Sequence, residues 1–347
     1  MEKNKMESWI AKRKKRMRNR SAKVLFDGIK KGDVVALSSA ITLIESDNPS
    51  HSTDAQSLVQ MCLPLSGKSI RVGITGVPGV GKSTFIETFG KLLVEKGKRV
   101  AVLAIDPSSS VSGGSILGDK TRMNELSTDK NVFIRPSAAG ATLGGVARKT
   151  RESILLCEAA GFDVVLIETV GVGQSETVVK SMVDFFLLLM LSGAGDELQG
   201  IKKGIMEMAD ALVITKADGD NVSRSNLARR EYKNAIHLFP PNQNGWIPEV
   251  FCCSAKKNEN ITRVFEVIES FENHVKVNGY FDKNRLEQDK KWLSETLKEM
   301  ILDGFYGNSD LLSALKAAEQ SIDDGEITSF QAAAELFELY RNYAGKI

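Results

Sequence analysis

The stretch from Ile70 to Thr84, IRVGITGVPGVGKST, most constrains what this chain can fold into. A β-branched apolar run turns through glycines into Lys82 and Ser83, and an amphipathic helical pattern follows at once. The spacing G-x-x-x-x-G-K-[ST] is typical of a loop whose backbone N–H groups surround a polyphosphate. We expect nucleotide contacts from Gly76, Gly79, Val80, Gly81, Lys82, Ser83 and Thr84.

The composition of the whole chain is typical of a globular protein. It has 347 residues, of which 42% are hydrophobic, enough for a buried core. Its four cysteines lie in apolar runs without C-x-x-C spacing, which predicts reduced, buried thiols. The charged N-terminus lacks the apolar segment of a signal peptide, and no apolar run is long enough to span a bilayer. These features predict a cytoplasmic protein without membrane insertion.

After the phosphate-binding stretch, short apolar runs alternate with helical patterns, which predicts an α/β fold of the P-loop NTPase kind. The sheet is expected to be mostly parallel with helices on both faces. The expected strands are 70–75, 99–105, 131–135, 163–168, 184–191, 211–215 and 249–252, with helices at 83–95, 148–160, 200–209, 222–238 and 261–276.

Helical regions flank this core on both sides. Residues 1–66 are expected to form an N-terminal helical extension, interrupted at Asn48-Pro49, and residues 67–279 the core. No strand pattern returns in residues 280–347, where one helix around Trp292 to Ile301 and two more at about 309–322 and 328–343 are expected. This C-terminal region either folds back onto the core or pairs with a second copy of the chain.

Carboxylates follow two of the predicted strands, at the edge where parallel sheets bind ligands. Asp106 follows the strand at 99–105, and Glu168 ends the strand at 163–168. Both are expected near Mg²⁺ and the terminal phosphate, the alternative being helix caps or turns. We expect Ser83 to be a further Mg²⁺ ligand and the Gly171 N–H to sense the terminal phosphate.

Two later strands end in residues that read a guanine base. Thr215-Lys216-Ala217-Asp218 has the form [NT]-K-x-D, in which the carboxylate accepts from the guanine N1–H and 2-amino group. Ser254, Ala255 and Lys256 follow the last strand, where a backbone N–H can contact the guanine O6. Thr215 stands where asparagine is commoner, so its support from neighbouring loops must differ.

Two polar, glycine-rich loops are candidate switches. The first, at 112–123, contains Asp119, a further candidate Mg²⁺ ligand, and Arg122, a candidate for contact with phosphate or a partner. The second, at 192–204, contains Gln199 and Lys202. A flexible loop with a helix cap is the plainer interpretation of the first.

The first 23 residues hold ten Lys and Arg against two Glu. Such a run can touch nucleic acid or anionic lipid, but no aromatic interleaving or fold motif supports this, and a solvated helix is favoured. We therefore expect no nucleic-acid partner.

Six motifs occur in this chain in the order that is seen in one group of proteins: GVPGVGKST, DPSSS, SGGSILGDKTRM, ETVGVGQSE, GDELQGIKKG and TKAD. In this the chain closely resembles the MeaB/ArgK family of P-loop GTPases over roughly residues 30–280. The resemblance implies a homodimeric GTPase chaperone that binds an adenosylcobalamin-dependent acyl-CoA mutase, typically methylmalonyl-CoA mutase, and gates cofactor loading. It implies that Gln199 to Lys203 couple nucleotide state to the partner, with Lys202 the residue to test first.

The implied chemistry is attack of water on the γ-phosphate of GTP, with Lys82, Asp106 and Glu168 as catalytic residues and Mg²⁺ as cofactor. The rival is a kinase or ATPase that acts on a lysine/arginine/ornithine transport binding protein, a role formerly attached to this family. It predicts ATP use, which the TKAD motif argues against.

Overall fold

The computed structural model describes residues 21–46, 48–105, 123, 125–136, 143–169, 175–193, 203–240 and 242–344. The chain divides into two compact units, Met1–Gln288 and Asp289–Ile347. Each unit is described by itself below.

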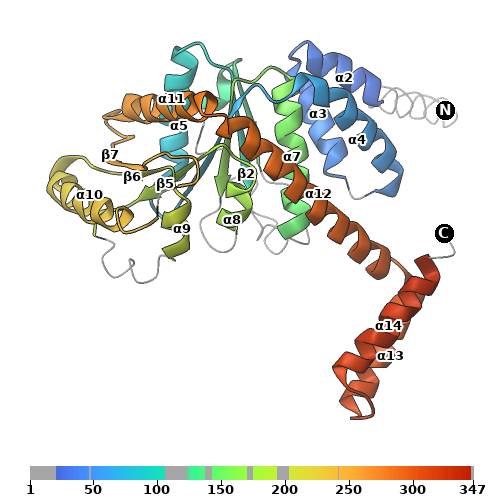
Figure 1. Cartoon of the computed structure of the whole chain (residues 1–347). Coiled ribbons are helices and arrows are strands. Elements are labelled where there is room, and N and C mark those ends of the chain that lie inside the picture. Colours follow the sequence, from blue (N-terminus) through green and yellow to red (C-terminus); the bar gives the residue numbers. More distant parts are fainter. Residues whose placement is uncertain are drawn as a thin grey trace, which may run out of the picture. The chain divides into compact units, whose positions relative to one another are not determined.

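A sheet forms the centre of the first unit (Figure 1). It has seven strands in the order β3-β2-β4-β1-β5-β6-β7, and every neighbouring pair is parallel. The expected α/β fold is confirmed, and all seven expected strands form within one or two residues of their predicted ends. The strands are β1 (Ile70–Gly76), β2 (Val100–Ile105), β3 (Val132–Arg135), β4 (Val164–Thr169), β5 (Phe185–Met190), β6 (Ala211–Ile214) and β7 (Glu249–Cys252).

Alternate residues of the central strands pack into different hydrophobic clusters on the two faces of the sheet. In β4, Val164 and Leu166 belong to one cluster, whereas Val165 and Ile167 belong to the other. Because both faces are covered, the strands read as continuous apolar runs rather than as alternating ones. Every residue of β5 is buried, as its FFLLLM sequence requires.

Helices cover both faces (Figure 1). The residues of α5 and α11 join the cluster of Val164, while those of α7 and α8 join the cluster of Val165, and α9 and α10 pack over β5 and β6. The six-residue α8 was not predicted, because it is too short to show a helical period. The bounds are α5 (Lys82–Glu95), α7 (Leu143–Ala159), α8 (Ser175–Lys180), α9 (Lys203–Met208), α10 (Val222–Ile236) and α11 (Ile261–Val277), with short 3-10 turns at Leu63–Leu65, Leu126–Thr128 and Gly219–Asn221.

Three helices precede the sheet and pack on α7: α2 (Ala22–Lys30), α3 (Val34–Ile44) and α4 (Pro49–Cys62). The Asp33 carboxylate caps α3 by accepting from the N–H groups of Val35 and Ala36. Asn48-Pro49 is the start of α4 rather than a longer break. Proline is favoured in the first turn of a helix, where its missing N–H costs nothing.

Buried charges at the start of β1 and β5 tie the first turns of α12 (Tyr280–Tyr306) to the sheet. The Arg285 guanidinium donates to both carboxylate oxygens of Asp184, at 2.9 and 2.7 Å, and to the carbonyls of Gly67 and Ser69. Glu158 on α7 accepts two bonds from Arg71, at 2.8 and 3.0 Å. Burial alone would raise the pKa of Glu158, but the bonds and charge of Arg71, with Ser69 and Arg285, lower it below its ordinary value.

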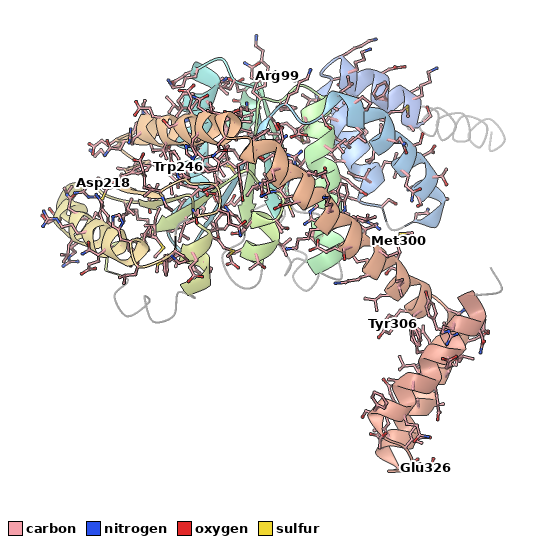
Figure 2. All side chains as sticks on the ribbon, in the orientation of Figure 1. Arg99, Asp218, Trp246, Met300, Tyr306 and Glu326 are labelled. Carbon is pink, nitrogen blue, oxygen red and sulfur yellow. The ribbon has the colours of Figure 1, made fainter. Side chains whose placement is uncertain are left out.

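The second unit contains the rest of α12 together with α13 (Ser309–Asp323) and α14 (Ser329–Ala344), so all three expected C-terminal helices form. The Tyr340 ring packs against Phe305, with ring centroids 5.9 Å apart, and the Tyr343 hydroxyl donates to Asp310 at 2.5 Å. Large apolar side chains nevertheless stay exposed in this unit, including Met300 and Tyr306, which are labelled in Figure 2. The others above two-fifths exposure are Leu293, Leu297, Ile301, Leu302, Phe330 and Phe337.

The four thiols are free. Burial raises the pKa of Cys62 to about 11 and that of Cys253 to about 12, and it raises the pKa of Cys157 still further. These thiols are therefore protonated and unreactive at neutral pH. Within the described residues, no helix is both long enough and apolar enough to cross a membrane.

Candidate nucleotide-binding site

The loop between β1 and α5 has the geometry of a phosphate cradle. Gly76, Gly79 and Gly81 have φ angles of 159°, 77° and 91°. A Cβ on Gly76 would lie 2.4 Å from the Leu189 carbonyl oxygen, so only glycine fits there. A Cβ on Gly79 would meet nothing within 4 Å, so glycine is required there by its left-handed backbone and not by a close neighbour. Gly81 then caps the N-terminus of α5, where the helix dipole favours an anion.

Three side chains hold carbonyl groups of this loop. The Lys82 Nζ donates to the Gly76 carbonyl at 2.8 Å, and the Lys216 Nζ donates to the Gly79 carbonyl at 2.7 Å. The Thr215 hydroxyl donates to the Val80 carbonyl, also at 2.7 Å. These three bonds orient the peptide groups of the loop.

Lys82 is the half-buried cation of the cradle. Burial lowers its pKa from the ordinary lysine value, while the charges of Glu168 and Glu176 act in the opposite direction. A polyphosphate placed here would add further negative charge beside the desolvated ammonium.

The end of β4 lies beside the end of β1, and this brings Glu168 to the cradle. Glu168 is paired in register with Ile74 and is 6% exposed. One residue further, the Thr169 hydroxyl donates to the Thr75 hydroxyl at 2.8 Å in a buried contact that joins the two strand ends. Ser83, half-buried in the first turn of α5, supplies a hydroxyl. An oxygen set of this kind suits Mg²⁺.

The base-reading residues converge at the ends of β6 and β7. Asp218 (labelled in Figure 2) accepts a short hydrogen bond from the hydroxyl of Ser254, which is fully buried. The Ala217 N–H donates to the Cys253 carbonyl at 3.1 Å, which joins the two loops. The carboxylate is thereby held in one orientation and stays partly exposed.

Neighbouring residues complete this loop. Lys216 adopts a left-handed conformation, with φ at 55°, and its carbonyl accepts from the Asn221 amide at 2.8 Å. Ser192, shortly after β5, donates to the oxygen of the same amide at 2.7 Å. After β7, the Ala255 carbonyl accepts from Thr88 on α5 at 3.2 Å, and Lys256 is exposed.

The predicted residues that the structure describes thus gather at one edge of the sheet. The phosphate loop, Glu168, Thr215 to Asp218 and Ser254 to Lys256 all follow or end parallel strands there. Several predicted site residues lie outside the described residues: Asp106, Asp119, Arg122, Gly171, Gln199 and Lys202.

Sequence reasoning missed two contributors. Glu176, 6% exposed on α8, acts electrostatically on Lys82. Its only sequence signal was its place three residues after Gly173, in the glycine-containing sequence that follows β4. Thr75 was also missed, because its contact with Thr169 depends on strand order.

A parallel sheet with a phosphate loop after β1, and with candidate base-reading loops after β6 and β7, two and three strands away, defines the chain as a P-loop NTPase. The model of the family described as "Methylmalonyl Co-A mutase-associated GTPase MeaB" matches residues 37–310. The chain belongs to this family, as the sequence resemblance predicted.

Individual relatives agree with this assignment. The chain is 49% identical over 309 residues to a "Putative GTPase" of Caulobacter vibrioides, covering 89% of this chain and 94% of the relative. It is 44% identical over 328 residues to the mouse "Methylmalonic aciduria type A homolog, mitochondrial", covering 92% and 79%. A crystal structure of an "LAO/AO transport system kinase" superposes with a TM-score of 0.73 at 35% identity, covering 92% of this chain and 97% of that one.

Proposed function

We propose that this protein is a Mg²⁺-dependent GTPase that acts as a chaperone for an adenosylcobalamin-dependent acyl-CoA mutase of the methylmalonyl-CoA type. The observation that carries the GTPase part is the fixed Asp218 carboxylate at the same sheet edge as the phosphate loop. Membership of a family described by its association with methylmalonyl-CoA mutase supports the partner.

In this proposal the residues of the cradle divide the work. The Lys82 ammonium and the loop amides stabilise the charge that develops on the transferred γ-phosphoryl group. Ser83 and Glu168, with Asp106 and Asp119, would hold Mg²⁺, which neutralises phosphate charge when bound. The Asp218 carboxylate would accept from the guanine N1–H and 2-amino group, while the Lys216 stem covers the base.

The switch part of the proposal concerns four residues. The Gly171 N–H would bond the γ-phosphate and release it after hydrolysis. Arg122, Gln199 and Lys202 would pass the change to the mutase. Slow basal hydrolysis, accelerated by the partner, is expected of such a switch.

The partner is tested with purified, cobalamin-loaded methylmalonyl-CoA mutase and the full chain. We expect the two proteins to co-elute in gel filtration, with an affinity that differs between GDP and a non-hydrolysable GTP analogue. The matched adenine nucleotides serve as controls and should produce no such difference. Separate elution in both guanine-nucleotide states would contradict the chaperone role.

We further propose that the chain has three parts, residues 1–66, 67–279 and 280–347. The protein would be a homodimer joined through the last of these parts. Leu293, Leu297, Met300 and Ile301 recur at helical spacing on α12, and each is at least 45% exposed. Apolar surface of this extent is typical of an interface.

Light scattering on the full chain should therefore report the mass of two chains. The double variant Leu297→Glu, Met300→Glu should report the mass of one, because both charges would enter the interface. Leu238→Glu is the control, since Leu238 is 85% exposed in the first unit and should not affect assembly. A monomeric wild-type chain would overturn the proposal.

We also propose a cytoplasmic location, on the strength of the buried, reduced thiols. The rival activity, phosphorylation of a transport binding protein, finds support in the name of the similar "LAO/AO transport system kinase". It requires ATP, and the held Asp218 carboxylate disfavours adenine, which offers no N1–H at that edge.

A further inference from the structure

Thr215 occupies the first position of the base-reading motif, yet its hydroxyl points into the protein. The residue is only 3% exposed. Its hydroxyl donates to the Val80 carbonyl at 2.7 Å, and the Met190 carbonyl lies 3.3 Å away, already accepting from the Thr215 N–H at 2.9 Å. A hydroxyl has one proton to donate. The shorter contact, to the phosphate loop, takes it.

The bond to Val80 has a consequence within the loop. The Val80 C=O and the Gly81 N–H belong to one planar, trans peptide group and so point in opposite directions. Fixing the carbonyl toward Thr215 turns the Gly81 N–H to the other side. Gly81 is the N-cap of α5 with φ at 91°, a conformation in which its amide can face an anion at the helix start.

The Thr215 hydroxyl is also unable to donate to a bound guanine base. Guanine presents N7 and O6 as acceptors on its second hydrogen-bonding edge. Thr215 is buried with its only hydroxyl proton engaged, so its side chain has no donor left for these atoms. Lys216 likewise directs its ammonium to the Gly79 carbonyl, at 2.7 Å. Of the motif's side chains, Asp218 remains to make polar contact with the base.

We propose that Thr215 is a positioning residue for the phosphate loop and makes no polar contact with guanine, so that Asp218, through the N1 and 2-amino edge, is the one side chain of this motif that reads the base. The inference rests on the proposed binding of guanine nucleotides. It implies that the protein does not distinguish guanine from 7-deazaguanine, in which N7 is replaced by carbon.

Calorimetric titration of the full chain with GDP, 7-deaza-GDP and ADP tests the first part of the proposal, that Thr215 makes no polar contact with the guanine base. We expect GDP and 7-deaza-GDP to bind with dissociation constants within about twofold of each other. A 7-deaza-GDP affinity tenfold or more below that of GDP would overturn the inference. Equal binding of ADP and GDP would instead defeat the proposed GTPase function, and the two failures are therefore distinguishable.

Two variants test the positioning half. Thr215→Val keeps the shape and removes the donor, so it should weaken GDP and 7-deaza-GDP binding by the same factor, about tenfold. Thr215→Ser restores a donor and should recover most of the affinity. An unchanged affinity in Thr215→Val, or a loss confined to GDP, would contradict the proposal.

A purely structural role for Thr215 makes a different prediction. It would lower the unfolding temperature without changing nucleotide affinity at temperatures where the variant is folded. Unfolding is therefore followed in parallel without nucleotide. If Thr215→Val fails to fold, Thr215→Ser and the wild-type comparison of GDP with 7-deaza-GDP still decide the question.

Discussion

Replacement of Lys82 by alanine is expected to abolish GTP hydrolysis, with a loss on the order of a thousandfold in single-turnover phosphate release. The ammonium is the only described cation that bonds the first carbonyl of the phosphate loop, at 2.8 Å from the Gly76 oxygen. In the proposed reaction it neutralises charge on the transferred group. Wild-type turnover in the variant would remove the site assignment.

Lys91→Ala is the matched control. Lys91 lies on the same helix, α5, but its ammonium pairs with Glu87 and Glu125 at the surface, away from the loop. Its loss should leave hydrolysis unchanged. Circular dichroism on both variants shows whether any loss of activity reflects the site rather than the fold.

The environment of Lys82 also fixes the sign of a pH effect. Burial lowers its pKa, whereas bound phosphates favour the charged form. At alkaline pH, Lys82 therefore keeps its proton, or takes one up, when nucleotide binds. Nucleotide affinity should fall as the pH rises through the pKa that Lys82 has in the nucleotide-free protein. This pH dependence is a second test of the role of Lys82.

Replacement of Asp218 by asparagine is expected to remove the preference for GTP over inosine and xanthosine triphosphates. The carboxylate accepts from two guanine donors, and a charge-assisted pair of this kind is worth on the order of a hundredfold in affinity. Xanthosine carries a carbonyl in place of the 2-amino group, so the asparagine amide can donate to it. Competition binding with the triphosphates of guanosine, inosine, xanthosine and adenosine measures the change.

Asp220→Asn is the matched control for this variant. Asp220 is two residues further along the chain and exposed, whereas the Ser254 hydroxyl donates to Asp218. Retention of wild-type discrimination in Asp218→Asn would contradict base reading by Asp218. Preference of the wild-type protein for ATP would instead favour the kinase rival.

The elements of the sheet were predictable because the central strands are covered on both faces and consist mostly of buried apolar residues. The FFLLLM sequence of β5 is the extreme case. Strand order was not predictable in the same way, because it depends on which crossovers pack together. The pairing of β4 with β1, which brings Glu168 and Thr169 to the phosphate loop, emerges only in three dimensions.

Local chemistry explains the remaining differences. The sequence pattern predicts an interruption at Pro49, yet this residue starts α4 because Asn48 provides the cap. Glu176 carries no motif of its own, and its effect on Lys82 follows from the fold of α8 against the sheet. Thr215 is recognisable by its place in a motif, but its partner Val80 lies 135 positions earlier in the chain.

The Arg285 contacts limit how far the chain can be truncated from its C-terminus and still fold by itself. A chain that stopped at Gly279 would keep every residue of the nucleotide edge but would lose the guanidinium that covers Asp184 and approaches Glu158. Glu158 would keep its ion pair with Arg71, whereas Asp184, whose side chain is 2% exposed, would lose the guanidinium that neutralises it. Leaving buried charge without its partner is strongly destabilising. The first turns of α12 therefore belong, thermodynamically, to the first unit, whatever the remainder of the helix does.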